Sequence, residues 1–219
     1  MDRDSRIGRY GRRSLLVHLG VALAMLPKAA LADSTTPLIW AFGDSLSAGY
    51  GLPPDQGFSA QLQAELRRRG VAATVRNGGI AGDTSAQGRA RLRWGLRGLG
   101  RAPDLVIVEL GANDMLRGLP VPQAKANLAQ ILDELRRRGI PALLVGMRAA
   151  PNLGPDYARS FEAMYPALAR AYRVPLYPFF LDGVAANRAL IQRDGLHPNA
   201  RGVSVIVRRI APAVRGALR

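Results

Sequence analysis

The sequence predicts an α/β fold in which a mostly parallel sheet is covered by helices on both faces. Short apolar runs alternate along the chain with amphipathic segments of helical period, which is the pattern of repeated strand–helix–strand units. The 219 residues suit one such domain, and neither an internal repeat nor a long linker divides them. Because parallel strands are joined by right-handed crossovers, we expect three α/β/α layers.

The first strand is expected at residues 38–42, where five apolar residues occur in a row. An amphipathic segment over 56–69 predicts a helix that ends at Gly70. A second, shorter strand is expected at 73–76, before an Asn-Gly-Gly turn. A second helix is expected over 84–97, with an Asp-Thr pair at its start to cap it.

The second half of the chain continues the alternation. Residues 105–110 form the clearest buried strand, and 121–138 carry leucine and isoleucine on one helical face before a glycine. An apolar run predicts a fourth strand at 142–147, and 156–173 predict a helix with a proline inside it, which suggests a kink. A fifth strand is expected within 174–180.

A last amphipathic helix is expected over 199–218.

In such a fold functional residues gather on the loops that follow the carboxyl ends of the strands. Four polar, glycine-containing loops occupy these positions, at residues 43–45, 77–83, 111–114 and 194–198. We therefore expect the four loops to meet at one edge of the sheet.

Residues 1–32 resemble an export signal. An arginine-rich start precedes a twelve-residue apolar run at 15–26, and an Ala-Leu-Ala cleavage site ends at Ala32. The run is shorter than the roughly 20 residues needed to span a bilayer. A pair of arginines before it also fits a twin-arginine signal, so both export routes stay open, as does an uncleaved anchor. We expect residues 33–219 to act in the periplasm or outside the cell.

Composition limits the function classes. The formal net charge of +15 comes almost wholly from arginine, since Lys28 and Lys125 are the only lysines. This charge could attract an anionic surface such as a membrane, but a compositional bias toward arginine is the favoured explanation. The arginines are scattered over predicted helix faces without interleaved aromatic residues, which argues against nucleic-acid binding. The absence of cysteine excludes a thiol nucleophile and thiolate metal sites.

The loops carry the residues of a serine nucleophile system. Ser45 follows the first strand, and a serine needs a base to remove its proton. His197 is the only histidine outside the leader, and Asp194 lies three residues before it, where a tight turn can place a carboxylate beside the imidazole. The backbone N–H groups of Ser45 and Gly82 and the side-chain amide of Asn113 are candidate oxyanion donors. Ordinary turn chemistry is the alternative for each of these loops.

The sequence around these residues resembles the GDSL, or SGNH, hydrolase family. The resemblance rests on four blocks in the family's order: Gly-Asp-Ser-Leu-Ser at 43–47, Gly-Asp-Thr at 82–84, Gly-Ala-Asn-Asp at 111–114 and Asp-Gly-Leu-His-Pro at 194–198. It is similar above all to the bacterial thioesterase I, arylesterase and lysophospholipase L1 type, and it covers about residues 38–215.

The resemblance implies a flavodoxin-like, five-stranded parallel sheet and no metal or organic cofactor. It implies Ser45 as nucleophile, His197 as base, Asp194 as the residue that orients it, and Gly82 and Asn113 as oxyanion donors beside the Ser45 N–H. One departure is an alanine at position 112, where members of the family often have a second glycine.

Five residues are candidates for substrate binding. Leu116, Met147 and Phe180 are expected near the site edge, where they line an acyl groove unless they only pack the loops. Arg117 either attracts an anionic head group or is an ordinary solvated charge. Asp44, which precedes the serine, is also included.

Together these features predict a monomeric, exported serine esterase. Its expected substrates are small acyl esters and thioesters, including aryl esters and lysophospholipids, cleaved through an acyl-enzyme. One alternative is a carbohydrate O-deacetylase of the same superfamily. A second, from another class, is a non-catalytic module that binds envelope lipid or polyanion.

Overall fold

The structure, a computed structural model, describes residues 36–218, so the predicted leader at 1–32 lies outside the described residues. Its centre is a parallel sheet with the strand order β2-β1-β3-β4-β5, and this order confirms the flavodoxin-like sheet that was predicted. The strands are β1 (Leu38–Gly43), β2 (Thr74–Asn77), β3 (Leu105–Glu109), β4 (Ala142–Val145) and β5 (Leu176–Tyr177).

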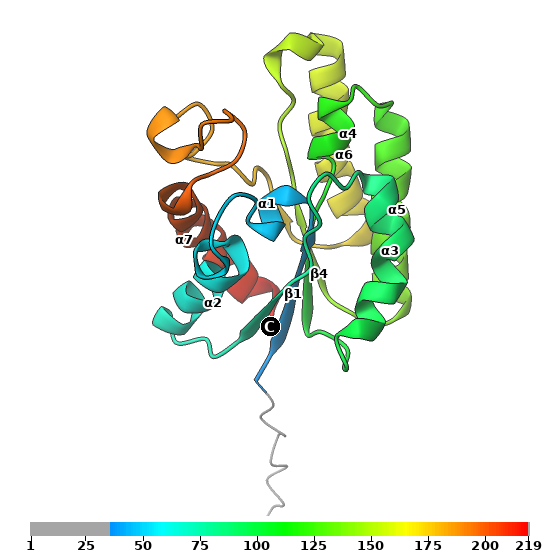
Figure 1. The fold of residues 1–219 in the computed structure, drawn as a ribbon. Helices are drawn as coiled ribbons and strands as arrows, with labels where there is room; N and C mark the ends of the chain where they lie inside the picture. Colours follow the sequence, from blue (N-terminus) through cyan, green and yellow to red (C-terminus); the bar gives the residue numbers. More distant parts are fainter. Residues whose placement is uncertain (1–35, 219) are drawn as a thin grey trace, which may run out of the picture. The chain divides into compact units, whose positions relative to one another are not determined.

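Helices cover both faces of the sheet, as Figure 1 shows. One face carries α2 (Phe58–Arg68) and α7 (Ala200–Ala217), and the other carries α3 (Ser85–Gly98), α5 (Val121–Arg137) and α6 (Pro155–Tyr172). Each helix buries one apolar stripe, and α5 and α7 carry their arginines on the outer face. The three-layer α/β/α architecture is thereby confirmed.

The central strands β1 and β3 are buried on both faces, as expected for a parallel sheet between two helical layers. Ile39 and Ile107 have no exposed surface. The helices add buried leucines, such as Leu62 from α2 and Leu128 from α5. This core fixes the strand ends from which the functional loops leave.

The structure differs from the expected elements mainly in the loops. Two short helices were not predicted: α1 (Ser45–Ala48), directly after β1, and α4 (Ala112–Leu116), directly after β3. They span four and five residues, so they are too short to produce a helical period in the sequence. The fifth strand is also shorter than expected, because only Leu176–Tyr177 pair with β4.

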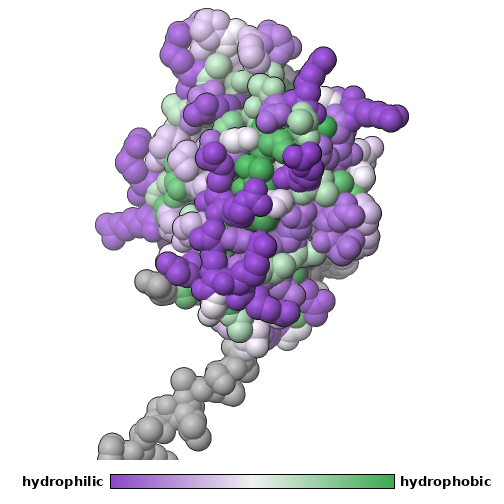
Figure 2. Space-filling view, turned by 90° about the vertical axis from the view of Figure 1, so that its left-hand side faces the viewer, coloured by the Kyte–Doolittle hydropathy of each residue, from purple (hydrophilic) through white to green (hydrophobic). Residues whose placement is uncertain are grey.

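The register of the sheet brings the loops to one edge. Gly43 at the end of β1 pairs with Glu109 at the end of β3, and Glu109 pairs in turn with Val145 of β4. The loops after these strands therefore start side by side, as the sequence predicted. Hydrophilic residues dominate the face that carries α2 and α7, and its most strongly hydrophobic patch lies in the upper half, with other hydrophobic residues scattered elsewhere (Figure 2).

Within residues 36–218, no helix combines the length and the apolar character required to cross a bilayer.

Candidate active site

Ser45 is the first residue of α1, at the point where β1 ends. Asp44 caps this helix: its Oδ1 accepts a hydrogen bond from the backbone N–H of Leu46 at 3.0 Å. This cap stabilises the turn between β1 and α1. Ser45 is half-buried there and remains accessible from solvent. The sequence therefore places the hydroxyl at the edge of the sheet.

His197 and Asp194 share one short loop before α7. The Nδ1 of His197 lies 2.6 Å from Oδ2 of Asp194, and its Nε2 lies 2.9 Å from Oγ of Ser45. The other carboxylate oxygen of Asp194 accepts hydrogen bonds from the N–H groups of Leu196 and His197 at 2.9 and 3.0 Å. Burial alone would raise the pKa of Asp194, but these hydrogen bonds outweigh it and lower that pKa to about 2.

This geometry fixes the imidazole. An ionised Asp194 accepts the Nδ1–H, so Nε2 is left as the acceptor that faces the Ser45 hydroxyl. The three side chains thus form one hydrogen-bonded line from carboxylate to hydroxyl. Such a line can move the serine proton to His197 as the serine oxygen attacks a carbonyl carbon.

Gly82 lies on the loop after β2, and Asn113 is the second residue of α4, the short helix after β3. Gly82 has a φ of +84°, a left-handed conformation that favours glycine. Nδ2 of Asn113 donates to Oδ2 of Asp44 at 3.1 Å and to the carbonyl oxygen of Asp83 at 3.0 Å. Asn113 is therefore tied both to the cap beside Ser45 and to the loop that carries Gly82.

Two carboxyl groups are buried beneath the serine turn. Asp44 is fully buried, and burial raises its pKa to about 6. Glu109, at the end of β3, has 2% of its surface exposed and accepts a hydrogen bond from Oγ of Ser47 at 2.8 Å. Burial and the nearby charge of Asp44 raise the pKa of Glu109 well above its ordinary value. Both effects favour the protonated form of Glu109, which lies beside the N-cap of α1.

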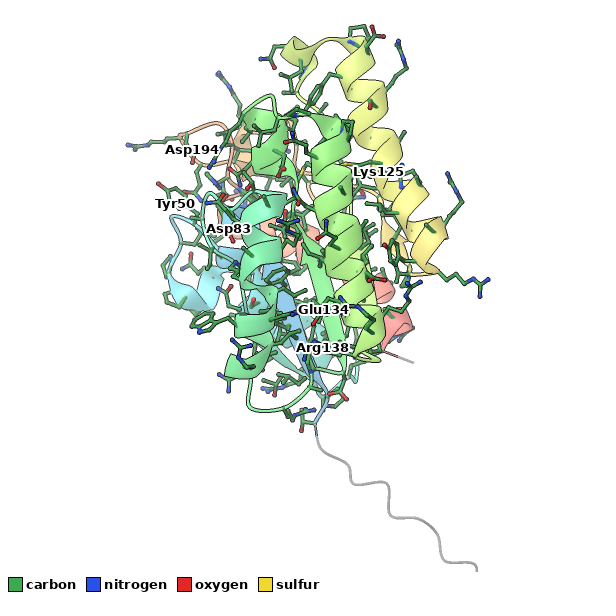
Figure 3. All side chains as sticks on the ribbon, turned by 90° about the vertical axis from the view of Figure 1, so that its right-hand side faces the viewer. Tyr50, Asp83, Lys125, Glu134, Arg138 and Asp194 are labelled. Carbon is green, nitrogen blue, oxygen red and sulfur yellow. The ribbon has the colours of Figure 1, made fainter. Side chains whose placement is uncertain are left out.

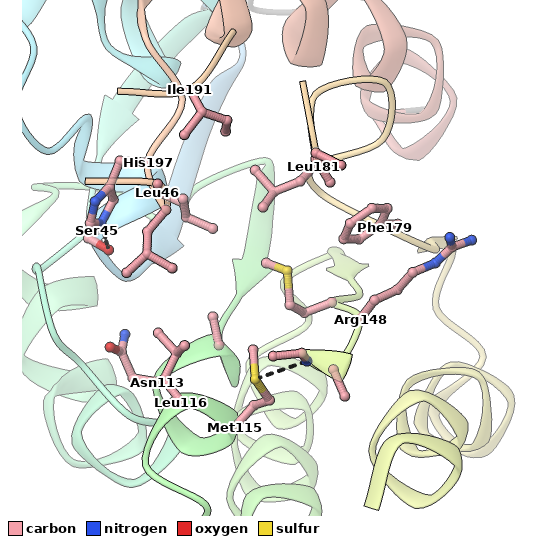
Figure 4. A pocket seen from close by; sticks show the side chains of 18 of the residues that line it. Ser45, Leu46, Asn113, Met115, Leu116, Arg148, Phe179, Leu181, Ile191 and His197 are labelled. Atoms are coloured by element: carbon pink, nitrogen blue, oxygen red, sulfur yellow. Dashed lines mark hydrogen bonds between the residues drawn. The ribbon is translucent and has the colours of Figure 1, made fainter. Parts of the chain in front are cut away.

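A pocket of about 840 Å³ opens beside Ser45 and His197. Figure 4 shows Ser45 and His197 on one side of it, Phe179 and Arg148 on the opposite side, and Leu46, Met115 and Leu116 between them. Its wall is mostly apolar and is formed by the segments that follow all five strands, with Gly82 from the segment after β2. An apolar pocket next to an activated hydroxyl suits the acyl part of an ester.

The five candidates for substrate binding are placed differently. Leu116 and Met147 line the pocket, whereas Asp44, Arg117 and Phe180 do not. Phe180 points into the core, where its ring lies 5.1 Å from that of Phe58. Arg117 donates to the carbonyl oxygen of Gly82 at 2.7 Å, and Asp44 is the buried helix cap described above.

Comparisons with known proteins identify the family. Residues 41–205 match the GDSL-like lipase/acylhydrolase family. This chain belongs to that family. It is 38% identical over 206 residues to the esterase TesA of Pseudomonas aeruginosa, which covers 94% of this chain and 100% of TesA. It is 40% identical to thioesterase 1/protease 1/lysophospholipase L1 of Escherichia coli, across 78% of each chain.

Solved structures give the same result. The crystal structure of AlinE4, an SGNH-hydrolase family esterase, superposes with a TM-score of 0.72 and 49% identity, covering 84% of this chain and 98% of AlinE4. The GDSL hydrolase described here is thus a serine hydrolase that acts on ester bonds.

Sequence reasoning missed several residues around the site of this GDSL hydrolase. The ring of Tyr50 lies against the imidazole of His197, with centroids 4.6 Å apart. The guanidinium of Arg91 contacts Asp83 and donates to the carbonyl oxygens of Gly43 and Gly78 at 2.8 and 2.9 Å. Arginine is frequent in this chain, so no sequence signal separated Arg91 from the exposed ones.

Among residues 36–218, the structure places no group of three or more histidine, aspartate or glutamate side chains where they could hold a metal ion.

Proposed function

We propose that this hydrolase is an exported esterase that cleaves apolar acyl esters and thioesters through an acyl-enzyme at Ser45. The observation that carries the proposal is the hydrogen-bonded line from Ser45 through His197 to Asp194 at the mouth of the apolar pocket. A serine hydroxyl with an oriented base beside an apolar cavity is suited to acyl transfer.

Acylation begins when Oγ of Ser45 attacks the carbonyl carbon of the ester and its proton passes to Nε2 of His197. The ionised Asp194 stabilises the imidazolium that forms. The carbonyl oxygen becomes an oxyanion, which accepts hydrogen bonds from the N–H groups of Ser45 and Gly82 and from Nδ2 of Asn113. To donate to the oxyanion, Nδ2 of Asn113 exchanges one of its two hydrogen bonds, that to Asp44 or that to the carbonyl oxygen of Asp83. The bond to the alcohol or thiol then breaks, and His197 returns the proton to this leaving group.

Deacylation repeats these steps with water as the nucleophile. His197 removes a proton from the water molecule, whose oxygen attacks the acyl carbon bound to Ser45. The same three donors stabilise the second oxyanion. Collapse of this intermediate releases the carboxylic acid, and His197 returns the proton to Oγ of Ser45.

The pocket supports acyl chains longer than acetyl. Its volume of about 840 Å³ is larger than an acetyl group needs, and its wall is apolar. Both features favour an esterase over an acetyl-specific deacetylase. The names of the relatives, an esterase and a thioesterase 1/protease 1/lysophospholipase L1, support both ester and thioester substrates.

Export, oligomeric state and membrane contact complete the proposal. The arginine-rich start and the Ala-Leu-Ala site support cleavage near Ala32 and action in the periplasm or outside the cell. We propose a monomer that approaches anionic membrane surfaces transiently through its net positive charge.

A p-nitrophenyl ester series from acetate to palmitate, measured on residues 33–219 and on the Ser45→Ala variant, tests the function. We expect the greatest kcat/KM beyond acetate and its loss in the variant, with an unchanged circular dichroism spectrum. Activity on acetate alone would favour the deacetylase. Activity of the variant close to that of the wild type would contradict Ser45 as nucleophile.

A further inference from the structure

The segment that carries His197 and Asp194 has an exposed tip. Asp194 has 36% of its side chain exposed, and Leu196 is 49% exposed. Nε2 of His197 nevertheless has to stay within hydrogen-bonding distance of Ser45, which lies 152 residues away in the sequence. The packing of the tip itself therefore offers little to hold the two loops together.

Gln192, at the base of this loop, joins it to the serine loop. Its Nε2 donates to the carbonyl oxygen of Tyr50 at 2.8 Å and to that of Pro198 at 2.9 Å. Its backbone N–H donates to the carbonyl oxygen of His197 at 2.7 Å. One residue thus closes the loop on itself and fastens it to the segment that follows α1.

Two further observations show that this contact is built closely. Both partners of the side chain are carbonyl oxygens, so only its amide nitrogen can face them. Gly51 approaches Gln192 so closely that a Cβ at position 51 would clash with Oε1 of Gln192. Gly51 also has a φ of +73°, so glycine is favoured at this position for two reasons.

The contact also places an aromatic ring. The carbonyl group that Gln192 holds belongs to Tyr50, whose ring lies 4.6 Å from the imidazole of His197 at an angle of 38°. Tyr50 is 54% exposed, so little else confines its side chain. Figure 3 shows Tyr50 and Asp194, from the two joined loops, on the same side of the molecule.

We propose that Gln192 is a positioning residue for the reaction, which acts by docking the histidine loop onto the serine loop and so keeps His197 aligned with Ser45. The inference rests on the proposed roles of these two residues. Replacing Gln192 by glutamate keeps the shape of the side chain but turns a carboxylate oxygen toward two carbonyl oxygens. Both side-chain hydrogen bonds are then lost, and this side chain no longer fastens the histidine loop to the serine loop.

Gln61 offers a matched control. Its Nε2 also donates to two carbonyl oxygens, a local one at Gln56 (2.7 Å) and a remote one at Ala200 (3.0 Å). Its side chain is partly exposed, as is that of Gln192. Gln61→Glu therefore removes the same kind and number of hydrogen bonds but acts between α2 and the first turn of α7.

The experiment compares Gln192→Glu and Gln192→Met with Gln61→Glu and Gln61→Met, using kcat and KM for a p-nitrophenyl ester and the thermal midpoint. Misplacing a catalytic group by about 1 Å can cost roughly 100-fold in rate. We expect the Gln192 variants to lose about 10- to 100-fold in kcat with KM within about threefold, and the Gln61 variants to keep kcat within about threefold. Comparable kcat in the Gln192 and Gln61 variants would overturn the proposal.

A double-mutant cycle separates positioning from general destabilisation. If Gln192 acts through His197, Gln192→Glu changes the residual kcat of the His197→Ala variant by less than about threefold. A full additional loss in that background would refute positioning through His197. Near wild-type activity of His197→Ala alone would instead contradict the proposed function, so the two failures are distinguishable.

Discussion

Replacing Asn113 by alanine tests the oxyanion site and the buried carboxyl beside it together. The variant loses one oxyanion donor, which typically costs about 10²- to 10³-fold in kcat. It also loses the hydrogen bonds to Asp44 and to the carbonyl oxygen of Asp83. At about 1 kcal/mol each, these two bonds predict a loss of about 2 kcal/mol in the free energy of unfolding.

The stability loss should depend on pH. The pKa of Asp44 is about 6 in the folded protein and 3.8 in its ordinary state, so ionisation of Asp44 destabilises the fold as pH rises through this range. The hydrogen bond from Asn113 favours the charged form and limits this effect. Without that bond the pKa of Asp44 rises further. The variant is therefore destabilised more at pH 8 than at pH 4.5.

Urea unfolding at both pH values and steady-state kinetics measure these effects. Asn127→Ala is the control, because Nδ2 of Asn127 donates a single hydrogen bond, to Oγ of Ser85 at 3.0 Å, and does not contact Ser45 or Asp44. We expect this control to lose about 1 kcal/mol with kcat within about threefold. If Asn113→Ala also kept kcat within threefold, its role as an oxyanion donor would be refuted.

Three further predictions concern other parts of the fold. Glu109→Gln should flatten the pH dependence of stability. Burial and the charge of Asp44 raise the pKa of Glu109, so the wild type loses stability as pH rises above 4.5. If urea unfolding gave the same change in the free energy of unfolding between pH 5 and 8 for the variant and the wild type, this would count against the prediction. Leu116→Trp, which fills part of the pocket, should shift the preferred p-nitrophenyl ester to a shorter chain, and an unchanged preference would place the acyl chain elsewhere. Tyr165→Phe removes the hydrogen bond to the carbonyl oxygen of Leu110 and should lower the thermal midpoint by about 2–4 °C without changing kcat, as differential scanning calorimetry and ester kinetics would show.

The sequence predicted the helices, the strands and their layers because these follow from long, regular patterns. Buried runs such as that of β3 and stripes such as that of α5 extend over whole elements. His197 could be singled out because it is the only histidine outside the leader. The resemblance to GDSL hydrolases supplied the strand order and the pairing of loops.

The pocket wall was harder to predict. Phe179 and Phe180 are adjacent and equally apolar, and only the path of the loop after β5 decides that Phe179 lines the pocket while Phe180 enters the core. Irregular loops have no period from which a side chain's direction can be read. The docking contact of Gln192 joins residues 142 apart, and a single sequence carries no signal of such pairing.

The position of Asp194 and His197 on one short loop makes the acid–base pair a self-contained module. The pair is held by contacts three residues apart, and the bridge between Ile191 and Pro198 closes the loop at its base. Local opening of the domain would therefore leave the carboxylate and imidazole together while separating them from the serine. Inactivation by mild denaturant should then precede global unfolding. It should reverse on dilution, because only the contact between the histidine loop and the serine loop has to form again.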